Sequence, residues 1–313
     1  MRAITMSGFG VDAGPAEHPT PSPAPGQVLV RVHASSVNGF DVSVAAGYLQ
    51  GMMEHRFPVV LGKDFAGTVE AVGDGVSRFG VGDRVFGVVM QPFLGDGGFA
   101  EYVAVDAHGP ITAVPDGLDL TTAGALGLAG AAAHDSVAAI APVSGETVLI
   151  SGATGGVGAI AVQLAAAVGA TVIATATPGE EASFVTGFGA THTVDYTGDL
   201  AAQVRAIAPD GVDAVLHLAG DGTALFALLV PGGRLASTLG FTPEQTNDLG
   251  VTVTTIMANP ASSTLDALAV KAATAALQVP VTRTYPLHEV PQALADFRGG
   301  TLGKLAVNVA AGE

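Results

Sequence analysis

The sequence has no cysteine, which excludes disulfide bonds, thiolate catalysis, iron–sulfur clusters and zinc sites built on cysteine ligands. Basic residues are scarce: 12 Lys and Arg stand against 28 Asp and Glu, so the formal net charge is −16. A chain this acidic repels phosphate backbones, which argues against a nucleic-acid partner. Aromatic residues make up only 5% of the chain, whereas 43 glycines and many alanines indicate a core of small side chains, typical of a tightly packed α/β protein.

Long hydrophobic runs are also rare. The most apolar stretch, residues 121–145, consists mostly of Ala and Gly and contains His134 and Asp135. This composition favours a buried helix of a soluble protein over a membrane helix. The first ten residues hold no apolar segment typical of a secretion signal. We therefore expect a cytoplasmic protein without a membrane partner, and its 313 residues are enough for two domains.

The hydrophobic pattern changes along the chain. Residues 1–118 are β-rich, with alternating segments such as GQVLVRVHASSVN and glycine-punctuated turns. Residues 119–258 alternate short apolar strands, such as TVLISG, ATVIATA, VDAVLHLAG and GGRLASTLG, with helical segments. Apolar strands joined by helices predict a parallel sheet covered on both faces. From residue 259 the pattern predicts a helix (STLDALAVKAATAAL), a strand, a short helix and the final strand KLAVNV.

The glycine-rich stretch SGATGGVGAIAVQLAAAVGA, residues 151–170, follows an apolar strand and opens a helix. This context predicts a dinucleotide site rather than a flexible linker, although a structural turn remains the alternative. Gly155 lets the backbone approach a pyrophosphate, and Gly158 lets the helix pack on the strand. The free N–H groups and the dipole of the helix start attract phosphate. Ala153 replaces the first glycine of the usual motif, and the expected binding residues are Ala153, Thr154, Gly155, Gly156, Val157 and Gly158.

The end of the next strand bears on which dinucleotide binds. An Asp or Glu there would hold the ribose 2′-hydroxyl of NAD, but this chain has Thr175, Ala176 and Thr177. That favours NADPH, and we expect Thr175 and Thr177 to contact it. Glu180 and Glu181 follow and would repel a 2′-phosphate, so NADH remains an alternative cofactor.

Several motifs together resemble the medium-chain dehydrogenases/reductases, closest to the zinc-independent quinone oxidoreductase and enone reductase branch. They are SSVNGFDVSVAAGY, FPVVLGKDFAGTVEAVGDGVSRFGVGDRV, GGFAEYVAV, VLISGATGGVGAIAVQLA, VDAVLHLAG, VPGGRLASTLG and GKLAVNV, in the family's order. The resemblance implies a GroES-like catalytic domain, residues 1–118 and 259–313, and an inserted Rossmann domain, residues 119–258. The active site would lie in the cleft between them.

The resemblance also implies that no metal binds. The family's zinc enzymes use Cys, His and Cys ligands, and by position Asn38, Lys63 and roughly Leu128 replace them. Such a trio does not bind zinc well. Without a Lewis acid, the easier reaction is hydride transfer from nicotinamide to a quinone or to the C=C bond of an α,β-unsaturated carbonyl. That chemistry needs a hydrogen-bond donor at the carbonyl oxygen and a proton for the α-carbon.

Four residues are candidates for this chemistry. The resemblance assigns Asn38 a place near the nicotinamide, where it could donate to the substrate oxygen, or it could cap a turn. Tyr48 would line the same site with its hydroxyl, or pack as a loop aromatic. Lys63 could donate a proton or stabilise an enolate, or form an ion pair with Asp41 or Asp64. Asp41 is expected to orient the backbone or Lys63.

Three positions of the nucleotide domain are less regular. Tyr196 matches a tyrosine that packs near the adenosine phosphate in the family. Ala132 stands where many relatives have a threonine near the nicotinamide, and His217 replaces a common Asp or Asn.

The substrate is expected to be a small apolar carbonyl compound or quinone. Two alternatives remain: a tailoring enoyl reductase for one biosynthetic intermediate, and an NADPH-binding protein without turnover. Family analogy predicts a homodimer that pairs through the β-branched strand VTVTTIMA, residues 251–258, since an exposed apolar edge is a liability.

Overall fold

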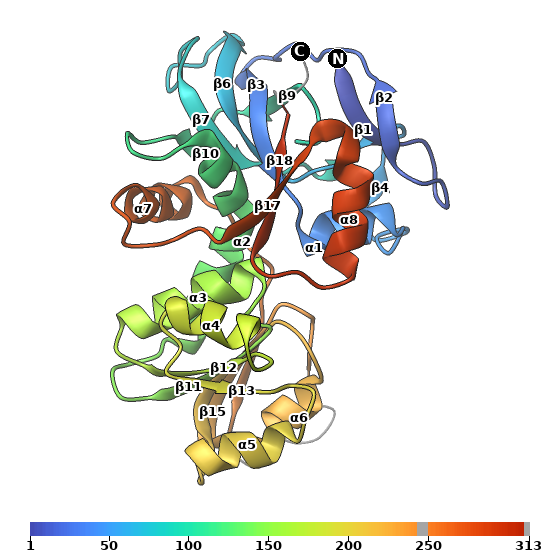
Figure 1. The fold of residues 1–313 in the computed structure, drawn as a ribbon. Helices are drawn as coiled ribbons and strands as arrows, with labels where there is room; N and C mark the ends of the chain where they lie inside the picture. The colour runs from blue at the N-terminus through green and yellow to red at the C-terminus, as the bar shows by residue number, and fades with distance from the viewer. Residues whose placement is uncertain (243–249, 310–313) are drawn as a thin grey trace. The chain divides into compact units, whose positions relative to one another are not determined.

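A computed structural model describes residues 1–242 and 250–309 of the chain. It contains two compact units (Figure 1): one comprises Met1–Ala129 and the chain from Pro260 onward, the other Gly130–Asn259. The change from the first unit to the second falls inside one helix, α2 (Leu120–Ile140).

The first unit is built on a seven-stranded sheet in the order β10-β7-β6-β3-β18-β17, with β9 also paired to β3. The last strand of the chain thus lies next to one of the first. This pairing places Lys304, the first residue of β18, near the end of β3. The strands are β3 (Gln27–Ser36), β6 (Asp64–Val72), β7 (Arg84–Val88), β9 (Tyr102–Asp106), β10 (Ile111–Ala113), β17 (Val281–Pro286) and β18 (Lys304–Asn308).

The described residues of this unit also form two smaller sheets and three further α-helices, besides the first half of α2. One sheet has the order β2-β1-β5 and the other pairs β4 with β8. Their strands are β1 (Arg2–Met6), β2 (Gly14–Glu17), β4 (Glu54–His55), β5 (Val59–Val60) and β8 (Phe93–Leu94). The helices are α1 (Gly39–Ala45), α7 (Ser262–Ala273) and α8 (Val290–Arg298), the last preceded by the 3₁₀ turn η1 (Leu287–Glu289).

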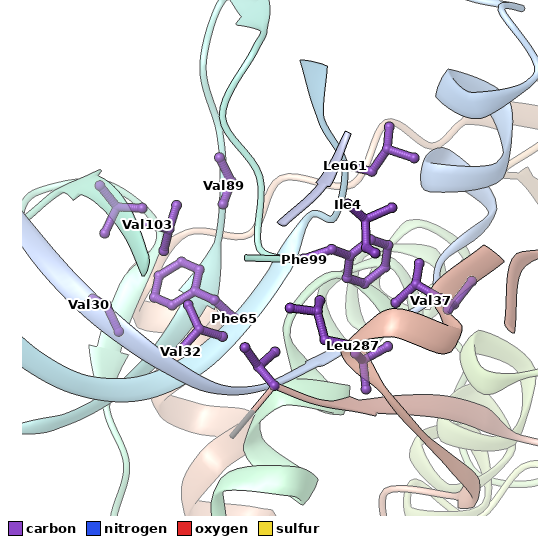
Figure 2. Close-up of a cluster of buried hydrophobic side chains, with 14 of the residues drawn as sticks. Ile4, Val30, Val32, Val37, Leu61, Phe65, Val89, Phe99, Val103 and Leu287 are labelled. Atoms are coloured by element: carbon purple, nitrogen blue, oxygen red, sulfur yellow. The ribbon is translucent and has the colours of Figure 1, made fainter. Parts of the chain in front are cut away.

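Alternation along these strands produces the core of the unit. In β3, Val28, Val30 and Val32 are buried whereas Arg31 is exposed, as a half-buried strand requires. Figure 2 shows part of the resulting cluster, with Phe65 and Phe99 among aliphatic side chains from several strands and from η1. Glycine makes one close contact possible: a Cβ on Gly62 would lie 2.5 Å from the backbone nitrogen of Phe99.

The second unit is a parallel six-stranded sheet in the order β13-β12-β11-β14-β15-β16. Its strands are β11 (Thr147–Ser151), β12 (Thr171–Thr175), β13 (His192–Val194), β14 (Val212–His217), β15 (Leu229–Ser237) and β16 (Thr252–Thr255). The connecting helices are α3 (Gly156–Ala167), α4 (Glu180–Gly187), α5 (Leu200–Ile207) and α6 (Gly222–Phe226). Figure 1 shows α3 and α4 on one face of the sheet and α5 and α6 on the other.

The strand order reverses direction between β11 and β14, which makes a topological switch point at their carboxyl ends. Open α/β sheets bind ligands at this point. The glycine-rich stretch begins there, and the Ser151 hydroxyl donates to the carbonyl of Ala219 at 2.6 Å across the two strand ends.

The predicted fold class, a GroES-like β-rich domain with a Rossmann parallel sheet, is confirmed. The predicted strands and helices of residues 147–237 are present, and the short helix α6 is an addition. Within the described residues, α2 alone has the length and apolarity to cross a membrane, but 72% of that apolar window is buried inside the protein. Such burial is typical of a core helix.

The core makes a matched test of packing. Val30 is fully buried and Val81 is 68% exposed. Val30→Ala should lower the free energy of unfolding by about 2 kcal/mol, because two buried carbon groups are lost and a cavity remains. Val81→Ala should change it by less than about 0.5 kcal/mol. Urea unfolding measures both, and equal effects would contradict the core assignment.

Candidate functional site

The first part of the site is the turn from β3 into α1. Asn38 has an extended backbone and is the N-cap of α1, and its N–H donates to the Asp41 carboxylate at 2.9 Å. Asp41 therefore orients the backbone, one of the two roles expected from the sequence. Both side chains are buried, with Asn38 7% and Asp41 1% exposed.

The Asp64 carboxylate is the centre of the hydrogen-bond network. Asp64 is the first residue of β6, and the register that sets Ala34 opposite Ala66 brings it beside Ser36 at the end of β3. One carboxylate oxygen accepts from the Leu128 N–H at 2.8 Å. The other accepts from the Ser36 hydroxyl at 2.5 Å and from the Asn38 amide at 2.8 Å. Asp64 is fully buried, so these partners replace the water that a carboxylate otherwise binds.

Lys304 is the cation of this network, and sequence reasoning missed it. It opens β18, the neighbour of β3, and is 3% exposed. Its Nζ donates to the carbonyl of Val37 at 2.9 Å and to Asn38 Oδ1 at 2.7 Å, and lies 3.8 Å from Asp64 Oδ2. The sequence did contain an indication of this role: Lys304 is one of only three lysines in the chain, and it begins an apolar strand.

Lys63 lies beside this network with a different set of contacts. Its Nζ donates to the carbonyl of Val89 at 2.8 Å and lies 4.8 Å from the centre of the Phe40 ring. Lys63 is 8% exposed. Asp64, one of the two ion-pair partners considered for Lys63, instead pairs with Lys304. The Asn38 amide is also occupied, because its Nδ2 donates to Asp64 and, at 3.3 Å, to the carbonyl of Ser36.

Burial shifts the protonation of these groups. Desolvation, and then the charge of Asp64, raises the pKa of Asp41 to about 7, so Asp41 is partly protonated near neutral pH. Desolvation lowers the pKa of Lys63 and of Lys304, against the opposing pull of both carboxylates. An ammonium with a lowered pKa releases its proton more readily, a property that general acids use.

Tyr48 is placed differently from the other three candidates. It follows α1, and 74% of its side chain is exposed. Nearby in the sequence, Met52 is 75% and Phe57 is 37% exposed, and Phe57 packs edge-on against Phe9 at 5.0 Å. The hydrogen bonds described above join Asn38, Asp41 and Asp64 to Lys304, and Tyr48 lies outside this network on an exposed loop.

The glycine loop of the second unit has the geometry of a phosphate cradle. Gly155 is the N-cap of α3, and Gly152 has a φ of +79°, which favours glycine. A Cβ on Gly158 would lie 2.1 Å from the carbonyl oxygen of Gly152 and 2.6 Å from the Cα of Ala153. The first N–H groups of α3 have no partner within the helix and are available for an anion.

The two threonines after this loop have different surroundings. The Thr175 hydroxyl is 3% exposed and accepts from the Gly152 N–H at 2.9 Å, so it fixes the loop to β12. The Thr177 N–H donates to the Glu181 carboxylate at 2.7 Å. The Tyr196 hydroxyl donates to the same carboxylate at 3.2 Å, and half of the Tyr196 side chain is exposed.

His217 has a structural account that the sequence did not supply. It is 4% exposed at the end of β14. Its Nε2 donates to the carbonyl of Gly220 at 3.1 Å, and its Nδ1 accepts from the Ser237 hydroxyl at 3.0 Å. The Ser237 oxygen in turn accepts from the N–H groups of Leu239 and Phe241. His217 therefore ties together the loops that follow β14 and β15. Ala132, in contrast, is a buried residue of α2.

The residues present do not fit a zinc ion. Across residues 1–242 and 250–309, no three His, Asp or Glu side chains lie close enough together to hold a metal. At the positions equivalent to the zinc ligands, Asn38 and Lys63 present hydrogen-bond donors, and Leu128 offers its backbone N–H to Asp64.

Comparison with known families gives two matches. Residues 24–116 match the alcohol dehydrogenase GroES-like domain, and residues 156–265 match the zinc-binding dehydrogenase domain. The description of the second family concerns a metal that the site above does not fit.

Individual proteins give the same assignment. The chloroplastic quinone oxidoreductase QR1 of Triphysaria versicolor is 32% identical over 228 residues, which are 70% of this chain and 68% of the relative. A mycocerosic acid synthase-like polyketide synthase of Mycobacterium tuberculosis is 41% identical over 218 residues, 68% of this chain; the match spans 10% of that much longer protein.

One solved structure extends the similarity to the whole fold. The mycobacterial protein Rv1454c, in complex with NADPH, superposes with a TM-score of 0.86 at 28% identity, covering 99% of this chain and all of that one. Together with the fold and the glycine loop, these matches show that the chain belongs to the medium-chain dehydrogenases/reductases, in the quinone oxidoreductase branch.

Proposed function

We propose that the chain is an NADPH-dependent, metal-independent reductase that transfers a hydride to a quinone or to the C=C bond of an α,β-unsaturated carbonyl compound. The observation that carries this proposal is the environment of Lys63, which stands at the position of a zinc ligand and is 8% exposed. Its ammonium makes one hydrogen bond within the described residues, so further N–H groups can donate to a substrate. A buried cation of this kind can take the negative charge that develops on a carbonyl oxygen.

NADPH is the proposed cofactor, and when bound it supplies the hydride from its nicotinamide ring. The relative solved with NADPH supports this choice. Gly155 and Gly156 would cradle the pyrophosphate at the start of α3, and the absence of a side chain at Gly158 lets α3 pack closely on the loop before it. Thr177 and Tyr196 would flank the adenosine. Glu181 already accepts hydrogen bonds from both, which reduces its repulsion of a 2′-phosphate.

The other candidates take supporting roles in this proposal. Lys63 donates to the substrate oxygen and is the proton source. Asn38 has a structural role in the site, because its amide N–H groups already donate to the oxygens of Ser36 and Asp64. Asp41 holds the Asn38 backbone. Tyr48 would contact the substrate from the exposed loop that follows α1.

The alternative substrate is a biosynthetic enoyl intermediate, which the polyketide synthase relatives favour. Such an intermediate could be attached to a carrier protein. The net charge of −16 argues against an acidic carrier protein, because like charges slow association. A free, small, apolar substrate is therefore the first choice.

The experiment that tests the function is NADPH oxidation by the purified protein, with a chelator present, against a panel of small quinones and enones. We expect turnover that the chelator leaves unchanged, and a slower reaction with NADH. Tight NADPH binding without turnover on any acceptor would move the assignment to a narrow biosynthetic substrate or to a non-catalytic protein. If neither dinucleotide bound, the assignment of the glycine loop would be wrong.

Lys63→Met should lower kcat about 100-fold, because the donor at the developing oxyanion is lost, and should leave the KM for NADPH unchanged. Lys271→Met is the matched control, since Lys271 is an exposed lysine of α7. Steady-state kinetics measures both variants. Equal rates for Lys63→Met and wild type would remove Lys63 from the mechanism.

We also propose a homodimer that pairs through β16, the edge strand of the nucleotide-binding sheet. Thr252–Thr255 carries no charged residue, so nothing on the strand itself prevents edge-to-edge pairing. Light scattering should give twice the chain mass, and Val253→Lys should shift the protein toward the monomer. A monomeric wild type would exclude this arrangement.

A further inference from the structure

The distribution of lysines in this chain is unusual. The sequence contains three, and two of them, Lys63 and Lys304, are 8% and 3% exposed. Lysine is almost never this buried unless it is paired. Both lie in the first unit together with two buried carboxylates, Asp41 and Asp64. The pairing between these four groups therefore decides which ammonium keeps free N–H groups.

The two lysines differ in the number and kind of their partners. Lys304 lies 3.8 Å from the Asp64 carboxylate and donates to Asn38 Oδ1 at 2.7 Å and to the carbonyl of Val37 at 2.9 Å. The Lys304 ammonium thus makes two hydrogen bonds and one ion-pair contact to protein oxygens. Lys63, although it directly precedes Asp64 in the chain, donates only to the carbonyl of Val89 among the described residues.

Both oxygens of Asp64 already have partners other than Lys63 in this arrangement. Its two oxygens receive the Leu128 N–H, the Ser36 hydroxyl and the Asn38 amide, besides the charge of Lys304. The Asn38 amide bridges the pair, since its nitrogen donates to Asp64 and its oxygen accepts from Lys304.

We propose that Lys304 is a positioning residue that holds Asp64 and the Asn38 amide, and thereby keeps Lys63 out of an ion pair and free to donate to the substrate oxygen. This inference rests on the role given to Lys63 in the proposed function. In this inference Lys304 of β18 affects the reaction through Asp64 and Asn38, without contacting the substrate.

The physical consequence of removing Lys304 follows from charge balance. A fully buried carboxylate without its cation is costly, and Lys63 is the other ammonium in the cluster. Lys63 should then turn toward Asp64, which stabilises its charged form and raises its titration midpoint. Asp41, whose charge also acts on both lysines, contributes in the same direction.

The test is an NMR titration of the full chain labelled with ¹³C at the lysine ε-carbons, where three lysines give three signals. Lys271, on the exposed face of α7, is the internal reference. In Lys304→Met the Lys63 midpoint should rise by about one pH unit, whereas Lys304→Arg should keep the wild-type value. In the double variant Asp64→Asn with Lys304→Met, which removes both charges, the midpoint should return toward wild type.

Kinetics of the same variants supplies the second readout. Lys304→Met should lower kcat about tenfold with the KM for NADPH unchanged, and the double variant should recover part of the loss. A Lys63 midpoint that is the same in folded Lys304→Met and wild type would overturn the inference. If Lys304→Met does not fold, Lys304→Gln and Asp64→Asn decide the question, because Lys304→Gln should raise the Lys63 midpoint and Asp64→Asn should lower it.

The two proposals can fail separately. A Lys63 midpoint that shifts as expected, in a protein whose quinone and enone turnover does not change, would leave the positioning by Lys304 intact and remove Lys63 as the donor. Turnover that depends on Lys63 but not on Lys304 would keep Lys63 as the donor and exclude the positioning role of Lys304.

Discussion

One buried carboxylate constrains the first unit more than any other group. Asp64 is fully shielded from water, and it is satisfied by the backbone of α2, by Ser36 and Asn38 around the end of β3, and by the cation of β18. The partners come from three separate parts of the chain, so satisfying this single charge fixes several elements at once. A buried charge that lost one of these partners would be costly, so the contacts depend on one another. Asn38, Asp41 and Lys63 take their orientations within that framework.

Local patterns in the sequence were sufficient for the fold and for much of the nucleotide-binding loop. Strand–helix alternation predicts the parallel sheet because apolar strands covered on both faces leave a readable pattern. The close packing at Gly158 follows from short-range geometry, and Gly155 lies at the start of the predicted helix. Asn38 and Asp41 are three positions apart, so a helix start brings them together. Lys63 is adjacent in sequence to the carboxylate that the cluster depends on.

Longer-range features were not accessible in the same way. Lys304 is 267 positions from Val37, and only the pairing of β18 with β3 brings them together. Thr175 stays a predicted cofactor contact, but its hydroxyl also accepts from the Gly152 N–H, a contact between two strand ends that the sequence did not reveal. His217 needed Ser237 at the end of the adjacent strand before its role could be read. In each case the missing information was strand order or register, which a residue pattern does not encode.

The discontinuous composition of the first unit has a consequence for biosynthesis. A chain emerging from the ribosome presents β3 and β6 early, and the whole nucleotide-binding unit follows before β18 appears. The nucleotide-binding unit, continuous in sequence, can close its sheet during translation. The early strands must meanwhile carry Asp64 without its cation. The Asp64 network is therefore completed only after β18 has been synthesised, whereas the dinucleotide cradle can form earlier.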